Sequence, residues 1–424
     1  MIDRALPVAA AFAFAAAAAV AAPPPSAVGA PGRHAEDSCV GCHAKLDDAR
    51  LRAPAEVANS DIHHTQGISC SGCHGGDPSS DDPAVAMNRA KGFTAKFTPR
   101  AIPEMCGSCH SDAARMLRYA PNIPTDQLAQ YRTSKHGQAL AKGDTNVAVC
   151  TSCHGTHGIL PPSDARSPVY PTRIVETCGR CHGNAALMGQ YGIKGNEISE
   201  YKRSVHYAAL VTKNDLSAPT CKSCHGAHGA APPGISSVSN VCGTCHLSQR
   251  ERFDLSPHKD AFSALQQPAC ESCHSNHAIL HPQDSWIGMG EKQLCGSCHS
   301  TGDNGAAAAA NIASALAKAS SAEVATTARV QRVERAGMLM DEATVKLEEA
   351  HQAFVMAQLE IHTANVGRVE AQTKTVLAAL ASADKSAGTA EAEIRYRRTG
   401  LFVSLAVIAL AMVLLILKIR AMER

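Results

Sequence analysis

Nine copies of one short string constrain this chain more than any other feature of its sequence. All 18 cysteines lie in Cys-x-x-Cys-His strings, so no cysteine is left for another purpose. Among the 424 residues there are only one Trp and eight Phe. A conventional large apolar core is therefore not expected. The strings begin at Cys39, Cys70, Cys106, Cys150, Cys178, Cys221, Cys242, Cys270 and Cys295.

The histidine after each cysteine pair decides which chemistry the pairs serve. Zinc sites, disulfides and thioredoxin-like centres use Cys-x-x-Cys pairs, but they need no His in the next position. Covalent c-type haem does need it, because the two thiols bind one porphyrin and the adjacent His ligates the iron. The predicted haem-bearing residues are Cys39, Cys42, Cys70, Cys73, Cys106, Cys109, Cys150, Cys153, Cys178, Cys181, Cys221, Cys224, Cys242, Cys245, Cys270, Cys273, Cys295 and Cys298. The predicted proximal ligands are His43, His74, His110, His154, His182, His225, His246, His274 and His299.

The spacing of the motifs predicts the fold of this region. Residues 39–299 hold nine motifs, about 29 residues for each, which is too few to build a separate globin-like pocket around every haem. We therefore expect a nonahaem domain over residues 39–301, mainly α-helical with extensive loops, whose core is made of stacked haems. Nine haem c groups are the predicted cofactors.

An internal repeat predicts the ligands on the opposite faces of the irons. Three motifs carry a second His three residues after the proximal one, and a Ser-x-His string lies upstream of each. A His so close to a proximal ligand cannot reach the other face of the same iron, so it would ligate a neighbouring haem. The alternative is a solvent-exposed or hydrogen-bonding role. These six candidates are His136, His157, His206, His228, His258 and His277.

Three further distal ligands are needed, and four histidines are available for them. They are His34, His63, His64 and His281. The repeat degrades here, since the first unit reads Ser60-Asp-Ile-His63-His64 and Asp77 stands where a distal His would follow His74. One haem could therefore have Met, water or an open position instead, although Met87 and Met105 are more typical of packing residues.

Both ends of the chain have the composition of membrane-targeting segments. Residues 1–22 place Arg4 before an Ala-rich apolar run and predict a secretory signal peptide, with an uncleaved anchor as the alternative. Residues 23–38 form a Pro-rich linker. The 17 uncharged residues from Leu401 to Leu417 predict a transmembrane helix over 400–418, with a cytoplasmic tail at 419–424; a buried core helix is the alternative. Export then places the haem motifs on the periplasmic face of a bacterial inner membrane.

Residues 302–394 are predicted to be a helical tether. Residues 303–394 lack Pro and Cys, and a heptad places large residues at one core position and alanines at the other. This pattern predicts a coiled coil or helical hairpin, and the alternative is a helix packed on the haem domain. Gly337, Gly367 and Gly388 are expected to interrupt the helix. His351 and His362 are expected to be surface residues. The heptad residues are Val333, Met340, Leu347, Phe354 and Ile361, with Ala336, Ala343, Ala350, Ala357, Ala364, Ala371 and Ala378.

The doubled pattern C-x-x-C-H-G-x-H after S-x-H resembles the periplasmic multihaem c-type cytochromes of anaerobic respiration. In style it is similar to the NapC/NrfH-type quinol-oxidising cytochromes and to the multihaem nitrite and hydroxylamine enzymes. The resemblance covers about residues 39–299. Two departures limit it: the quinol-oxidising members are anchored at the N-terminus, and this chain has no C-x-x-C-K motif like that of the nitrite reductases.

These observations predict an electron carrier rather than an enzyme. Two His ligands saturate an iron, so the expected function is to pass electrons between a quinol-linked membrane donor and periplasmic acceptors. The expected partners are a membrane quinol-oxidising subunit or other cytochromes, and a second copy or a partner helix at the helical region. A reductase of nitrite, hydroxylamine or a sulfur oxyanion, with one open haem face, is the alternative, and a structural or signalling tether is a third. With a net charge of +2 and no basic block, nucleic acid is not an expected partner.

Overall fold

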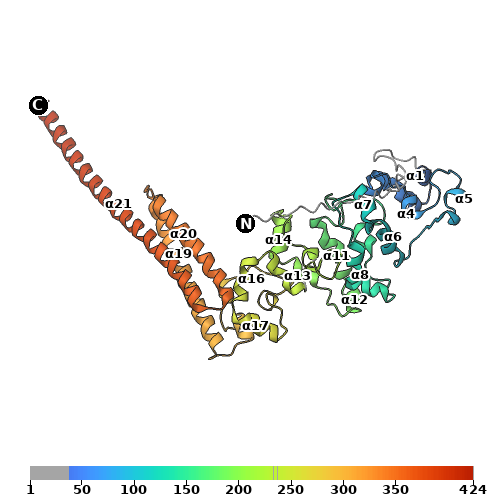
Figure 1. Cartoon of the computed structure of the whole chain (residues 1–424). Coiled ribbons are helices and arrows are strands. Elements are labelled where there is room, and N and C mark those ends of the chain that lie inside the picture. Colours follow the sequence, from blue (N-terminus) through green and yellow to red (C-terminus); the bar gives the residue numbers. More distant parts are fainter. Residues whose placement is uncertain (1–37, 233, 236, 424) are drawn as a thin grey trace, which may run out of the picture. The chain divides into compact units, whose positions relative to one another are not determined.

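The computed structural model describes residues 38–232, 234–235 and 237–423, and Figure 1 shows their arrangement. The predicted signal peptide, nearly all of the Pro-rich linker and His34 lie outside these residues. The described part is mainly helical and contains no β-strand, which confirms the predicted fold class.

The motif region consists of short helices joined by loops. Side chains of Asp, Asn or Ser accept hydrogen bonds from the first amides of many of these helices, which satisfies donors that a helix start leaves free. The α-helices are α1 Ser38–His43, α2 Ala49–Val57, α3 Ile62–Thr65, α4 Ser71–His74, α5 Pro83–Ala86, α6 Ala101–His110, α7 Ala113–Tyr119, α8 Gln127–Thr133, α9 Lys135–Ala141, α10 Cys150–His154, α11 Ile174–His182, α12 Ala185–Gly189, α13 Glu197–Tyr201, α14 Val205–Thr212, α15 Cys221–His225, α16 Leu247–Asp254, α17 Pro257–Ala264 and α18 Glu271–His274. The 3₁₀ turns are η1 Ala58–Ser60, η2 Arg89–Lys91, η3 Pro171–Arg173, η4 Val238–Asn240, η5 Cys242–Thr244, η6 Asp284–Trp286 and η7 Cys295–Ser297.

The chain divides into two compact units. The first contains the residues up to Ala95 together with the short segment His157–Ile159, and it holds the first two motifs. The second contains Lys96–Thr156 and everything from Leu160 onward, so it holds the other seven motifs and the helical region.

The helical region is a bundle of three long helices, α19 Asn304–Arg335, α20 Asp341–Glu360 and α21 Val366–Met422, with the 3₁₀ turn η8 Ile361–Thr363 before the last. One buried cluster joins Leu316 of α19, Phe354 of α20 and Val369 of α21. Alanines at the contacts, such as Ala350 and Ala357, let the helices approach closely. The bundle therefore supplies the large apolar core that the motif region lacks.

The predicted heptad holds over α20 but not beyond it. Ala343, Ala350 and Ala357 are buried, whereas Ala371 and Ala378 are exposed. The chain turns at Ala364, where φ is 50°, and α21 starts in a new register. Gly337, with φ of 90°, forms the other turn, between α19 and α20. A single heptad running through both turns was therefore a wrong prediction.

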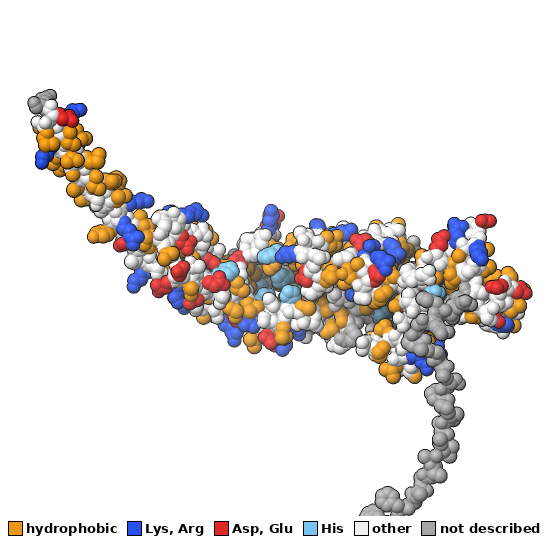
Figure 2. Space-filling model, turned by 90° about the horizontal axis from the view of Figure 1, so that it is seen from above, with side chains coloured by type: hydrophobic (Ala, Val, Ile, Leu, Met, Phe, Trp, Pro, Cys, Tyr) orange, Lys and Arg blue, Asp and Glu red, His pale blue; other side chains and the backbone are white. Residues whose placement is uncertain are grey.

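The C-terminal part of α21 continues past the bundle as a single helix. Apolar side chains from Leu401 onward are exposed, and Figure 2 shows them on the surface of the helix (orange). This stretch is long and apolar enough to cross a membrane. It supports membrane anchoring through the C-terminal helix.

Candidate functional site

Each of the nine motifs folds into one helical turn. Seven lie on α1, α4, α6, α10, α11, α15 and α18, and the other two on the 3₁₀ turns η5 and η7. Residues three apart on a helical turn share a face, so both thiols of each motif point to one side. The histidine follows directly at the end of the turn. This arrangement suits attachment of one planar group through both cysteines.

Local hydrogen bonds explain two residue choices around the repeated motifs. In α10 and α15 the serine before the second cysteine accepts a hydrogen bond from the backbone amide of the residue that directly precedes the motif. The distance is 3.0 Å in both the Val149–Ser152 and the Thr220–Ser223 pair. The glycine after the proximal His has φ of 77° at Gly226, and a Cβ there would lie 2.7 Å from the Ala231 oxygen. The H-G-x-H sequence thus permits a sharp turn before the second histidine.

Seven proximal histidines each face a second imidazole across a similar gap. An imidazole nitrogen binds a metal at about 2.0–2.1 Å, so two rings on opposite sides of one iron have centres roughly 6 Å apart. The observed ring centres are 6.0–6.3 Å apart, which fits an iron between them. The pairs are His74–His157, His182–His136, His154–His228, His246–His206, His225–His277, His299–His258 and His274–His362.

The pairs form two geometric classes. Where the second ring comes from Ser-x-His, as in His136, His206 and His258, the two planes are inclined by 62°, 44° and 59°. Where it follows a motif in the H-x-x-H pattern, the planes are nearly parallel, at 20°, 12° and 23°. Each class has one structural source, so the inclination reflects the segment that supplies the ring.

The Ser-x-His string has a structural explanation. Ser134 and Ser204 cap α9 and α14 by accepting bonds from the amides of Gly137 and Tyr207. The histidine is then the second residue of the helix, where the first turn fixes its direction. His63 occupies the same position on α3, with Asp61 as the capping residue.

Replacing Ser204 by Ala should therefore lower stability by about 1 kcal/mol, within the range of about 0.5–2 kcal/mol typical of lost caps. Ser204 is 2% exposed, so water cannot replace its bond to the Tyr207 amide. Thermal unfolding would measure the change. Ser199→Ala, at an exposed serine of the preceding helix, is the control and should change stability by less than about 0.5 kcal/mol. Equal effects of the two variants would contradict the capping role.

Backbone pairing holds the H-x-x-H segments in place. Ile159, two residues after His157, accepts a bond from the Ile62 amide at 2.8 Å, and Ile279, two residues after His277, accepts one from Val205 at 2.9 Å. In the first unit Asp61 also accepts the Ile159 amide at 2.8 Å. Burial alone would raise the pKa of Asp61, but hydrogen bonds from the His63 ring and from the Ile159 and His63 amides outweigh it and lower the pKa to about 2. The carboxylate is therefore a firm anchor for this segment.

Burial shifts several of the paired imidazoles toward the neutral form, which is the form that ligates metal. Burial, and then the facing imidazole, lowers the pKa of His136, His154 and His225, which favours neutral rings with a free lone pair. The Nδ1 of His74 lies 2.7 Å from the Thr94 oxygen, and that of His43 lies 3.0 Å from the Leu51 oxygen. A carbonyl can only accept, so Nδ1 is the donor and Nε2 remains for the iron.

Contacts between thiols join the motifs of the second unit in sequence order. The first cysteines of successive motifs lie close together in three steps: Cys106 beside Cys150, Cys178 beside Cys221, and Cys242 beside Cys270. In the steps between these, the second cysteine of one motif lies near the first cysteine of the next. Burial, and then that neighbouring thiol, raises the pKa of the second cysteine. The pairs are Cys153 with Cys178, Cys224 with Cys242, and Cys273 with Cys295. The third to the ninth motif therefore form one unbroken series.

The remaining predicted candidates are placed differently. His281 is exposed, and its Nδ1 lies 3.0 Å from the Pro282 oxygen. His63 and His64 lie on α3, where the His63 Nδ1 is 3.2 Å from Asp61. His351 is a surface residue, as predicted, and contacts Glu323 at 2.9 Å. The same prediction for His362 was wrong, since its ring faces His274.

Comparison with known proteins indicates the class of cofactor that these motifs bind. A family model for cytochrome c3 matches residues 62–183, and one for cytochrome c554 and c-prime matches residues 241–325. The C-type polyheme cytochrome OmcC of Geobacter sulfurreducens is 23% identical over 179 residues, which cover 37% of this chain and 21% of that protein. No solved structure matches the chain. These families bind haem c covalently, and their likeness together with the Cys-x-x-Cys-His motifs identifies the chain as a multihaem c-type cytochrome.

Proposed function

We propose that this cytochrome holds nine haem c groups and carries electrons between a quinol-linked membrane donor and acceptors on the periplasmic side. Haem c supplies one-electron redox chemistry. The observation that carries the proposal is the set of seven facing imidazole pairs, because a ligand on each side of an iron leaves no position for a substrate. His34, His63 and His64 are the candidates for the other two sixth ligands.

The unbroken series of motifs supports transport rather than storage. Neighbouring attachment sites lie close enough to influence one another electrostatically from Cys106 to the last motif, which supports short steps along the series. Two kinds of step alternate along it, one between two first cysteines and one from the second cysteine of a motif to the first cysteine of the next. Such a series has two ends, and a donor and an acceptor can dock at different ones.

The helical region favours a protein as the membrane donor. Helix α21 begins at Val366, close in sequence to His362, whose ring faces the proximal histidine of the eighth motif. From there it runs 35 residues to Leu401, a distance of about 50 Å along its axis. A quinol dissolved in the bilayer would be far from the nearest motif if the helix stands upright. A membrane quinol-oxidising subunit with its own cytochrome, or another cytochrome, would bridge this distance.

Intact-mass measurement of the mature protein should show the polypeptide plus nine haem masses. Low-temperature EPR of the ferric protein should then show low-spin iron alone, because every iron has two imidazole ligands. A mass corresponding to seven or fewer haems would contradict the count of nine. A high-spin signal that integrates to one whole haem would instead favour a reductase with an open haem face.

A further inference from the structure

We infer that His362, from the membrane-proximal bundle, is the sixth iron ligand at the motif of Cys270, Cys273 and His274, so that the bundle is a structural part of the haem series. This inference rests on the proposal that the motif carries haem. The rings of His274 and His362 have centres 6.2 Å apart and planes inclined by 22°. Both values match those of the H-x-x-H pairs, whose inclinations are 12–23°.

The order of the pairs explains why a ligand from the bundle is needed. The second, fourth and sixth motifs each face the H-x-x-H histidine that follows the next even-numbered motif: His157, His228 and His277. The eighth motif has no even-numbered motif after it. His351 and His362 are the only histidines of the chain beyond His299, and His351 is directed at Glu323. His362 therefore completes the series.

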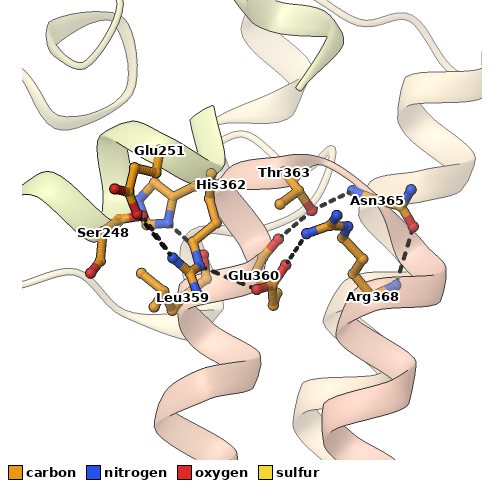
Figure 3. Close-up of polar contacts among 9 residues, drawn as sticks. Ser248, Glu251, Leu359, Glu360, His362, Thr363, Asn365 and Arg368 are labelled. Carbon is orange, nitrogen blue, oxygen red and sulfur yellow. Dashed lines mark hydrogen bonds and ion pairs between the residues drawn. The ribbon is translucent and has the colours of Figure 1, made fainter. Parts of the chain in front are cut away.

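The backbone around His362 is built to hold its ring in a fixed direction. His362 lies in the turn η8, and its Nδ1 is 3.0 Å from the Leu359 oxygen, which leaves Nε2 as the lone-pair nitrogen. The Thr363 hydroxyl donates to the Glu360 oxygen at 2.7 Å, and Asn365 caps α21 by accepting the Arg368 amide at 3.1 Å (Figure 3). Hydrogen bonds thus fix the backbone on both sides of His362.

One ion pair and one hydrogen bond fasten this turn and the end of α20 to the motif region. Glu360 is 7% exposed, and its carboxylate contacts Arg252 of α16 at 3.2 Å and Arg368 of α21 at 3.3 Å. Helix α16 begins directly after the proximal His246 of the seventh motif. A second attachment joins Gln358 to Asp284 at 3.0 Å, in the loop after the eighth motif. The bundle is therefore attached to the segments that precede and follow the eighth motif in the sequence.

His362→Ala in the full-length protein tests the inference. The variant should retain nine haem masses, because the attachment cysteines and proximal histidines are untouched, while one haem per chain becomes high-spin when ferric and binds carbon monoxide when ferrous. Added imidazole should restore the low-spin spectrum. His351→Ala, at an exposed position of α20 before the turn η8, is the matched control and should match the wild type in both spectra.

Two further variants keep the test decisive. His362→Ala/His281→Ala also removes the histidine seven residues after His274, which could substitute for the lost ligand, so the double variant should bind carbon monoxide at one haem even if the single variant does not. His362→Met preserves bulk and offers a sulfur ligand, so one haem should change its spectrum without binding carbon monoxide. If all three variants retain the wild-type spectra, the inference is wrong. Carbon monoxide binding by the wild type would contradict the proposed function instead, since the inference concerns the difference between variant and wild type.

Discussion

Replacing His277 by Met is expected to raise the reduction potential of one haem, the one at Cys221 and Cys224, on the order of 0.1–0.3 V, within the ~0.8 V range that axial ligands span. The His277 ring faces His225 at 6.0 Å, so the substitution exchanges one axial ligand and leaves the covalent attachment intact. A thioether ligand favours the ferrous state more than imidazole does. A potentiometric titration followed by visible spectroscopy should show one haem titrating above the range of the others.

This change should also slow electron passage through the whole chain. The sixth motif lies inside the series, between Cys178 of the fifth and Cys242 of the seventh, so an electron held there blocks transfer between the ends. His281→Met is the matched control, since His281 is exposed four residues further along the same segment. If both variants titrate like the wild type, His277 is not an axial ligand. If the His281 variant alone shifts, the two histidines have been assigned the wrong way round.

The pattern of motifs predicted the helical turns and most of the facing histidines because both depend on local geometry. A Cys-x-x-Cys-His string needs one turn of helix to place its thiols together, and a Ser-x-His string caps a helix with His in its second position. These requirements hold wherever the segment lies in the molecule. The sequence therefore indicated His136, His206 and His258 as a class, and the structure places each of them opposite a proximal histidine.

The sequence did not predict which histidine pairs with which motif. His157 faces His74, two motifs back along the chain, and not His110 of the third motif, which is nearer in sequence. This choice depends on backbone pairing between distant segments, such as Ile62 with Ile159 and Val205 with Ile279. A single sequence carries no signal for contacts between residues that are 74 or more positions apart.

His362 was missed because its local surroundings describe a helix surface. It follows the heptad residue Ile361 directly, and its spacing from His351 suggested a shared exposed face. Helix α20 ends at Glu360, however, and the turn η8 that follows directs the ring toward His274. One signal in the sequence could have pointed to it: only three H-x-x-H histidines are available for the four even-numbered motifs, so a fourth ligand must come from elsewhere in the chain.

Leu316→Ala in the three-helix bundle should lower the local free energy of unfolding by about 2–5 kcal/mol, the range found for Leu→Ala in cores. Leu316 is 0% exposed and packs with Phe354 and Val369, so the substitution leaves a cavity where all three helices meet. Hydrogen exchange of the bundle amides would measure the change, since it reports local opening in a protein whose parts need not unfold together. Val324→Ala on the same helix, at 69% exposure, is the control and should change protection by less than about 0.5 kcal/mol.

The effect of Leu316→Ala should extend to the eighth motif if His362 ligates its iron. Ile361, next to His362, packs against the same buried cluster as Leu316, so opening of the bundle withdraws the turn that holds the ring. Carbon monoxide binding should then rise slowly at one haem, at a rate set by bundle opening, and the Val324 variant should show no such phase. Loss of amide protection without this phase would mean that η8 stays docked through Glu360 and Arg252 while the bundle above it opens. The Leu316 variant therefore measures whether the bundle core or the ion pair at η8 keeps His362 in place.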